Sequence, residues 1–114
     1  MAAWCINCLH QQQAVIEALA AIDSEDLVYI SLDVDPTELP EDLAAYAENW
    51  GFDWRFVLAD RELLRQLAGA FGDQVLAPPS TPKLLIGRDG SVTGPLFGHL
   101  DAAAIEAELR AALG

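Results

Sequence analysis

Cysteines and basic residues are scarce in this chain of 114 residues, and each scarcity excludes a class of protein. Only two cysteines are present, too few for the disulfide framework that holds a small secreted fold together. Six lysines and arginines stand against 18 aspartates and glutamates, which gives a net charge of −12. Proteins that bind nucleic acids need basic side chains to neutralise phosphates, so we expect no nucleic-acid partner.

Long apolar runs and targeting segments are also missing. No stretch approaches the roughly 18 apolar residues that a membrane span requires, and residues 1–3 are too few to form a signal peptide. With 53% hydrophobic residues, the chain nevertheless has enough apolar material for a core. We therefore expect one domain, residues 1–114, without a membrane span.

The two cysteines form the motif around which the sequence is organised. Cys5 and Cys8 stand one helical turn apart, on one face, at the start of a segment with helical periodicity. Thiols at that separation can close a disulfide with little backbone movement. A helix N-terminus favours thiolate over thiol, so the pKa of a thiol in such a motif falls from about 8.5 to about 7 or below. The motif therefore predicts thiol–disulfide exchange.

Periodicity and turn residues predict four helices and four strands in the order α-β-α-β-α-β-β-α. The helices are expected over 6–22, from Pro40 to Gly51, from Asp60 to Gly72 and from Asp101 to Gly114. The strands are expected over 27–33, 54–58, 83–86 and 92–97, with a rigid proline-rich loop at 78–82. On the first helix, Leu9, Ile16 and Leu19 mark the apolar face, whereas His10, Gln11 and Glu17 are expected to face water.

A strand that should precede the cysteine helix is missing from the pattern. Sites in α/β domains lie at the carboxyl ends of strands, yet only four residues precede Cys5, fewer than the roughly 5–6 of an ordinary strand. We therefore expect a chain that is truncated at its N-terminus and a sheet of four strands. The strand at 27–33 would have one side exposed or paired with something unexpected. A fifth strand built from residues 1–4 would contradict this expectation.

Together these features resemble the thioredoxin superfamily, and within it the TlpA-like bacterial thiol–disulfide oxidoreductases. The resemblance rests on the Trp4–Cys8 motif, on Ser80-Thr81-Pro82 before a strand, and on the Asp89-Gly90 hairpin followed by Gly98. It implies a thioredoxin-like α/β fold, in which a mixed sheet flanked by helices lacks the strand before the cysteine helix.

The resemblance also implies roles for individual residues. Cys5, expected to be the more exposed sulfur, would be the nucleophile, and Cys8 would resolve the mixed disulfide. Pro82 would form a cis peptide bond and lie against the disulfide, and Thr81 would offer its backbone to the substrate chain. Trp4 would support substrate binding beside Cys5.

The partners and location that the resemblance implies follow from these roles. The partners would be protein thiols and disulfides and an upstream redox donor, in keeping with a part in cell redox homeostasis and without a cofactor. The full-length protein is expected to be extracytoplasmic or tethered to a membrane, with the cytoplasm as the alternative.

Two other functions stay open on the sequence alone. A copper chaperone would use Cys5, Cys8 and an imidazole such as His99 for Cu(I), although SCO-type copper-delivery proteins carry Cys-x-x-x-Cys and a histidine where this chain has only the loop 78–82. Alternatively, the chain is a non-catalytic thioredoxin-fold binding module with a structural disulfide. In an oxidoreductase, His99 would have a supporting role, whereas His10 is expected on the surface. With only two histidines, no structural zinc site is expected.

Overall fold

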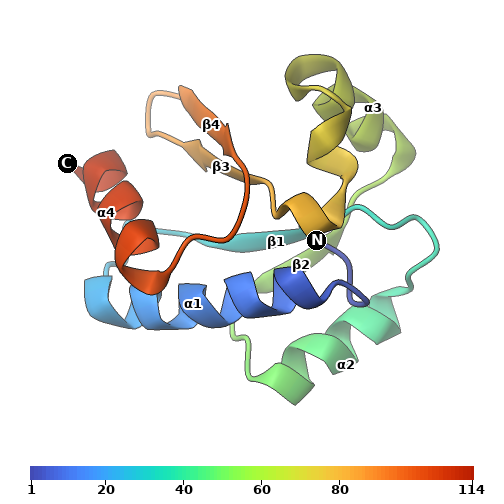
Figure 1. Cartoon of the computed structure of the whole chain (residues 1–114), viewed down its shortest axis with the longest axis horizontal. Coiled ribbons are helices and arrows are strands. Elements are labelled where there is room, and N and C mark those ends of the chain that lie inside the picture. Colours follow the sequence, from blue (N-terminus) through green and yellow to red (C-terminus); the bar gives the residue numbers. More distant parts are fainter.

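The computed structural model describes all 114 residues and has a mixed α/β fold (Figure 1). Its helices are α1 (Ile6–Ile22), α2 (Pro40–Trp50), α3 (Arg61–Phe71) and α4 (Ala102–Leu113). Its strands are β1 (Ile30–Asp33), β2 (Arg55–Leu58), β3 (Lys83–Ile86) and β4 (Val92–Leu96). Two short 3₁₀ helices, η1 (Asp73–Leu76) and η2 (Pro78–Ser80), connect α3 to β3. The predicted order of helices and strands is confirmed.

The helix ends lie where the sequence predicts them, because capping residues fix them. The carboxylate of Asp60 accepts the N–H of Leu63 at 2.8 Å, and that of Asp101 accepts the N–H of Ala104 at 2.8 Å. Each such cap contributes about 1 kcal/mol. Gly51 ends α2 with a φ of 73°, a conformation that glycine adopts without strain.

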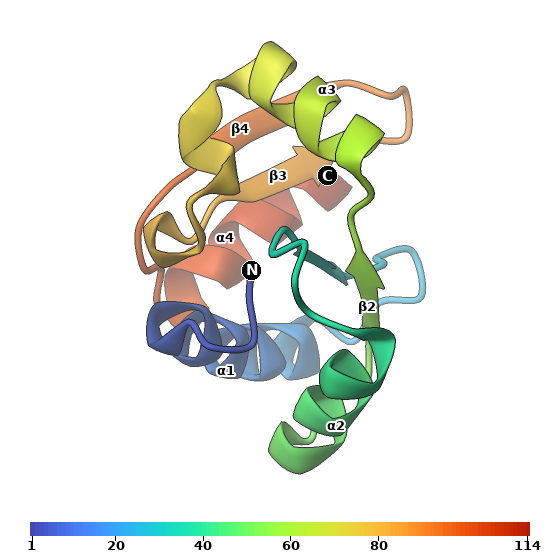
Figure 2. The ribbon, with the colours of Figure 1, turned by 90° about the vertical axis from the view of Figure 1, so that its right-hand side faces the viewer.

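The four strands form two separate two-stranded sheets. β1 pairs in parallel with β2, and β3 pairs antiparallel with β4. Four strands were expected and residues 1–4 form no fifth, but the expectation of a single mixed sheet is wrong. No strand is hydrogen-bonded to both pairs, so they do not form one sheet. Figure 2 shows the N-terminus between β3 and β1.

β1 is shorter than the predicted strand at 27–33. Its pairing with β2 begins at Ile30, which lies opposite Arg55, the first residue of β2. The edge of β1 that faces away from β2 carries the N-terminus. The ammonium of Met1 donates to the carbonyl of Leu32 at 2.7 Å, and the N–H of Val34 donates to the carbonyl of Met1 at 3.0 Å. These two bonds are those that a residue of a parallel strand makes with its neighbour. Met1 therefore occupies the position of a residue in a parallel neighbouring strand, opposite Asp33.

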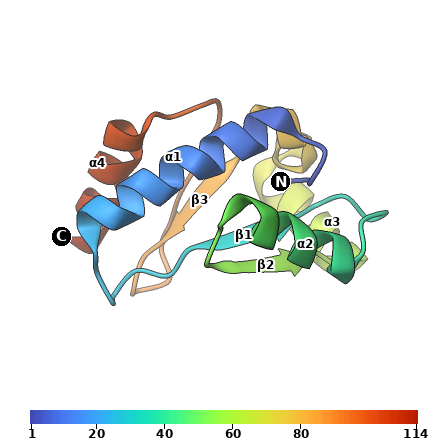
Figure 3. The ribbon, with the colours of Figure 1, turned by 90° about the horizontal axis from the view of Figure 1, so that it is seen from below.

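The largest apolar cluster lies between α1 and α4, where Val15 and Ala18 pack against Ile105 and Leu109. Figure 3 shows α4 beside the C-terminal half of α1. A second cluster joins α1 to α2 and to the segment before β2 through aromatic rings. Its buried members are Leu9, Tyr46 and Phe52, and the partly buried Trp54 and Phe56 pack against them.

A chain of buried hydrogen bonds connects these elements. The indole of Trp54 donates to the hydroxyl of Ser31 at 2.8 Å, and Ser31 donates to the side-chain oxygen of Gln12 at 2.6 Å. The amide nitrogen of Gln12 then donates to the hydroxyl of Tyr46 at 3.0 Å. Because buried polar groups are costly when unpaired, these hydrogen bonds fix β1 and α2 relative to α1.

The prediction that Gln11 faces water is wrong. Its side chain is buried and forms two hydrogen bonds with the backbone of Leu100, one to the carbonyl and one from the N–H, each of 2.9 Å. Ile16, which was placed on the apolar face, is instead exposed. The amide of Gln11 satisfies the backbone just before α4, which makes a polar residue favourable at a buried position.

Candidate dithiol site

The two cysteines begin α1. Cys5 is the N-cap residue, and its sulfur accepts a hydrogen bond from the N–H of Cys8 at 3.2 Å. Both residues are free thiols, and they pack together in one small apolar cluster. The first turn of a helix exposes unpaired N–H groups and the positive end of the helix dipole. The predicted placement of the pair at a helix start is therefore confirmed.

The expectation that Cys5 is the more exposed sulfur is wrong, because both cysteines are only 3% exposed. Residues 1–4 fold back over the helix start. Ala2 is fully buried against the thiols, and its carbonyl accepts the N–H of Cys5 at 3.1 Å. Met1 also packs against this cluster. The residues just before the motif therefore cover it.

Acidic side chains hold this covering segment in place. The N–H of Ala3 donates to both carboxylate oxygens of Glu38, at 2.9 and 3.2 Å. The indole of Trp4 donates to a carboxylate oxygen of Asp35 at 2.8 Å, while 60% of the residue remains exposed. Trp4 therefore lies beside Cys5 on the surface, where the sequence placed it. Its proposed contact with a substrate stays a prediction.

The proline-rich loop packs against the start of α1. The thiol of Cys8 donates to the carbonyl of Pro78 at 3.2 Å, and the side-chain amide of Asn7 donates to the carbonyl of Pro79 at 3.1 Å. Sequence reasoning placed this loop at the dithiol but selected Thr81 and Pro82. The carbonyls of the two preceding prolines make the observed contacts, and no residue type marks a backbone carbonyl as a partner in advance.

The expectation of a cis peptide bond at Pro82 is wrong: the Thr81–Pro82 bond is trans, and the cis bond of this chain is Gly94–Pro95 in β4. Thr81 is buried and has a φ of 45°, in the left-handed region. Its N–H donates to the carbonyl of Pro78 at 2.9 Å, which closes η2. The left-handed residue turns the chain from η2 into β3, so this turn is made without a cis bond.

Burial dominates the titration of the groups around the sulfurs. It raises the pKa of the Cys8 thiol to about 12, and the neighbouring side chain of Cys5 acts in the same direction. Burial also lowers the pKa of the Met1 ammonium and lowers the pKa of Lys83 to about 8. The ammonium of Lys83 donates to the carbonyls of Thr81 and Gly98, at 2.5 and 2.8 Å. Because its pKa is about 12, the Cys8 thiol is protonated at neutral pH in this arrangement.

Asp33 is a buried carboxyl group near the Met1 ammonium and the two thiols, and sequence reasoning did not identify it. Asp33 is 1% exposed, and one of its carboxylate oxygens accepts the N–H of Asp35 at 2.8 Å, while the other has no partner. Burial raises the pKa of Asp33 to about 7, and Glu38 acts in the same direction. The Met1 ammonium lies close enough to act on Asp33 and on both thiols. The signal in the sequence was an aspartate at the carboxyl end of an apolar strand.

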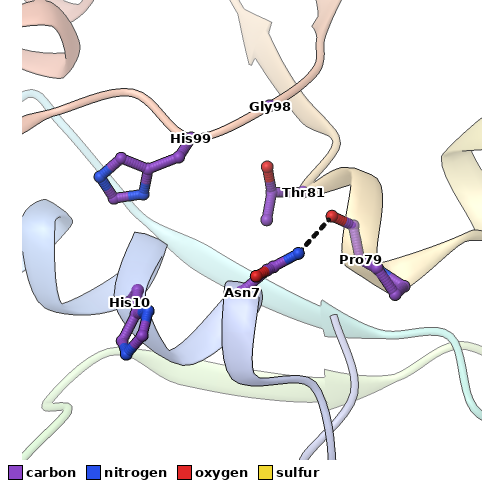
Figure 4. Close-up of a pocket in the computed structure, with 6 residues that line it drawn as sticks. All are labelled: Asn7, His10, Pro79, Thr81, Gly98 and His99. Carbon is purple, nitrogen blue, oxygen red and sulfur yellow. Dashed lines mark hydrogen bonds between the residues drawn. The ribbon is translucent and has the colours of Figure 1, made fainter.

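A polar pocket of about 470 Å³ adjoins the helix start (Figure 4). It is lined by Asn7, His10, Pro79, Thr81, Gly98 and His99. Neither cysteine lines this pocket. The structure therefore brings His99 to the loop 78–82 and the start of α1, and not to the two sulfurs. His10 is exposed, as predicted. No group of three or more His, Cys, Asp or Glu side chains is arranged to hold a metal ion.

None of the four helices has the length and hydropathy to cross a bilayer. Searches against protein-family models, curated proteins and solved structures find no match to this chain.

Proposed function

We propose that the chain is a thiol–disulfide oxidoreductase that exchanges electrons with protein disulfides through Cys5 and Cys8. The observation that carries the proposal is the hydrogen bond from the N–H of Cys8 to the sulfur of Cys5, with both thiols free at the start of α1. In proteins generally, the N-terminus of a helix favours a thiolate over a thiol. The order of helices and strands and the packing of the loop 78–82 against Cys8 support the proposal, whereas the division into two sheets does not. The assignment to a thioredoxin-like fold and to its TlpA-like branch is part of the proposal and rests on the sequence resemblance.

The roles of the two sulfurs follow from their surroundings. The Cys5 thiolate attacks a substrate disulfide and forms a mixed disulfide, and the released substrate thiolate takes up a proton. Cys8 then loses its proton and attacks the sulfur of Cys5, so that the second substrate thiol leaves. The pair has then lost two electrons and two protons to the substrate. An upstream thiol donor must restore the dithiol. The Cys8 thiol donates to the carbonyl of Pro78, and burial raises its pKa, so the proposal assigns the first attack to Cys5.

Access to Cys5 is the structural requirement of this scheme. Both cysteines are 3% exposed, so a protein substrate reaches Cys5 only when residues 1–4 move away. The contact between Ala3 and Glu38 is one of those that hold this segment. Replacing Glu38 with alanine should therefore speed the reaction of Cys5 with a small disulfide reagent, whereas Glu41→Ala, at an exposed position on α2, should not.

The burial of both sulfurs favours a second candidate, a binding module in which the pair is structural. The two functions differ in how the Cys5–Cys8 couple behaves in a glutathione redox titration. An oxidoreductase forms and loses the disulfide reversibly and reduces insulin, and Cys5→Ser abolishes both. A structural pair gives a disulfide that resists mild reductant, and this result would refute the proposal.

The same titration is repeated with Cu(I) to test the copper chaperone. Tight Cu(I) binding that is lost in His99→Ala, without insulin reduction, would replace the proposed function with copper delivery.

Cys8→Ser provides the mechanistic control. If Cys8 resolves the mixed disulfide, this variant accumulates a stable adduct between Cys5 and the substrate, which mass spectrometry detects.

A further inference from the structure

Lys83 is the only lysine of the chain and the only one of its six lysines and arginines that is partly buried. All the arginines are exposed, and three of them pair with carboxylates. Lys83 forms no such pair, and its ammonium donates to the carbonyls of Thr81 and Gly98 instead. Because charges away from water are normally paired with an opposite charge, an anion is the partner that Lys83 lacks.

The ammonium of Lys83 lies at the wall of the polar pocket beside the start of α1. Thr81 and Gly98, whose carbonyls it binds, both line that pocket. The two histidines of the chain line it as well: His10 extends from α1, and His99 extends from the loop before α4 (Figure 4). The only lysine and both histidines therefore gather around one cavity.

The lining of this pocket suits an anion. No carboxylate lines it, although 18 of the 114 residues are acidic. The side-chain amide nitrogen of Asn7 is occupied by the carbonyl of Pro79, whereas each imidazole carries at least one N–H that can donate to a ligand. The volume of about 470 Å³ is sufficient for a side chain or a small molecule. A cation and hydrogen-bond donors without a competing carboxylate favour a carboxylate ligand.

The pocket adjoins the dithiol through two of its lining residues. Asn7 stands between the two cysteines in the sequence. Pro79 follows Pro78, whose carbonyl accepts the thiol of Cys8. Burial lowers the pKa of Lys83 and the charge of Cys8 raises it, so these two groups lie within electrostatic range of each other. A substrate whose disulfide reaches the dithiol therefore places its neighbouring groups beside this pocket.

We propose that the pocket selects substrates that carry a carboxylate close to the exchanged disulfide, and that Lys83, His10 and His99 recognise this carboxylate. The proposal rests on the proposed function, because it names the substrate class of the same dithiol. The net charge of −12 by itself favours cationic substrates. The pocket and the overall charge therefore predict opposite preferences.

The test compares three small disulfides of similar length: the anionic dithiodipropionate, the neutral hydroxyethyl disulfide and the cationic cystamine. Each is reduced to two thiols while Cys5 and Cys8 form a disulfide. Each rate is divided by the rate of the same disulfide with dithiothreitol, which removes differences between the leaving thiols. All three need the same access to Cys5, so the covering by residues 1–4 cancels in the ratio. We expect dithiodipropionate to react about threefold faster than hydroxyethyl disulfide.

Variants assign this preference to the pocket. Lys83→Met should abolish the preference for the anionic disulfide, and Lys83→Arg should retain part of it. Arg88→Met, the matched control, removes the same charge at an exposed position outside the pocket and should leave the preference unchanged. His10→Ala combined with His99→Ala should reduce the preference about twofold. A variant that merely disturbs the fold slows the reaction with all three disulfides and leaves their ratio unchanged.

A binding measurement separates this proposal from the proposed function. Suberate has the length of dithiodipropionate but no sulfur, so its binding requires no exchange. Nuclear magnetic resonance of the intact chain should show the imidazole signals of His10 and His99 shifting at millimolar suberate. If suberate binds while none of the disulfides reacts, the redox function fails and the carboxylate pocket stands.

The origin of the carboxylate is tested with two disulfide-linked peptides that carry either glutamate or glutamine beside the cysteine. Faster reaction of the glutamate peptide assigns the pocket to protein substrates. Equal rates of the two peptides, together with the preference for dithiodipropionate, assign it to a small molecule.

Three results would overturn the proposal. The first is a set of rates that follows the net charge, with cystamine fastest and dithiodipropionate slowest. The second is a preference for the anionic disulfide that persists unchanged in Lys83→Met. The third is the absence of imidazole shifts up to about 100 mM suberate.

Discussion

Replacing Asp33 with asparagine should stabilise the folded chain above neutral pH. The carboxyl group is almost fully buried, one of its oxygens has no partner, and burial raises its pKa from the ordinary 3.8 to about 7. Since each pKa unit corresponds to about 1.4 kcal/mol, keeping Asp33 ionised in the folded chain costs about 4 kcal/mol. Asparagine carries no charge and keeps the oxygen that accepts the N–H of Asp35.

The pH dependence has a definite sign. A carboxyl group whose pKa is higher in the folded chain binds its proton more tightly there than in the unfolded chain. The contribution of Asp33 to the free energy of unfolding therefore falls as the pH rises from about 4 to about 7, and it stays low above that range. We expect Asp33→Asn to match the wild type near pH 4 and to exceed its stability at pH 8 by up to about 4 kcal/mol.

Urea unfolding followed by circular dichroism, at pH values from 4 to 8.5, measures this difference. Asp53→Asn removes one negative charge at an exposed position and is the matched control, since it separates the effect of burial from that of net charge. A parallel loss of stability in the wild type and in Asp33→Asn over this range would contradict the expected effect of burying Asp33. A variant less stable than the wild type at pH 8 would contradict it equally.

Two further substitutions test the buried hydrogen bonds. Gln11→Ala should destabilise the chain by about 2 kcal/mol, because it removes two bonds to the backbone of Leu100, whereas the exposed neighbour Gln13→Ala should have little effect in the same urea assay. Tyr46→Phe should cost about 1–2 kcal/mol, because it leaves the buried amide of Gln12 without its acceptor; an unchanged unfolding midpoint would show that water replaces the hydroxyl.

Local sequence determined most of the secondary structure. Helix starts and ends follow from residues that act within one turn, such as Asp60, Asp101 and Gly51, so their effect does not depend on the rest of the fold. The placement of Cys5 and Cys8 at the first turn of α1 follows from the same short-range pattern. These predictions held because each depends on residues only a few positions apart.

The tertiary structure alone decided which groups are covered and what they bond to. Periodicity marks a helix face but cannot identify a distant backbone partner, so Gln11 was expected in water although it binds Leu100. The burial of Cys5 depends on contacts between residues 1–4 and acidic groups more than thirty positions away. The division into two sheets likewise depends on which strand edges meet in space. Such long-range contacts depend on how separate elements pack, and residue types within any one element do not encode that packing.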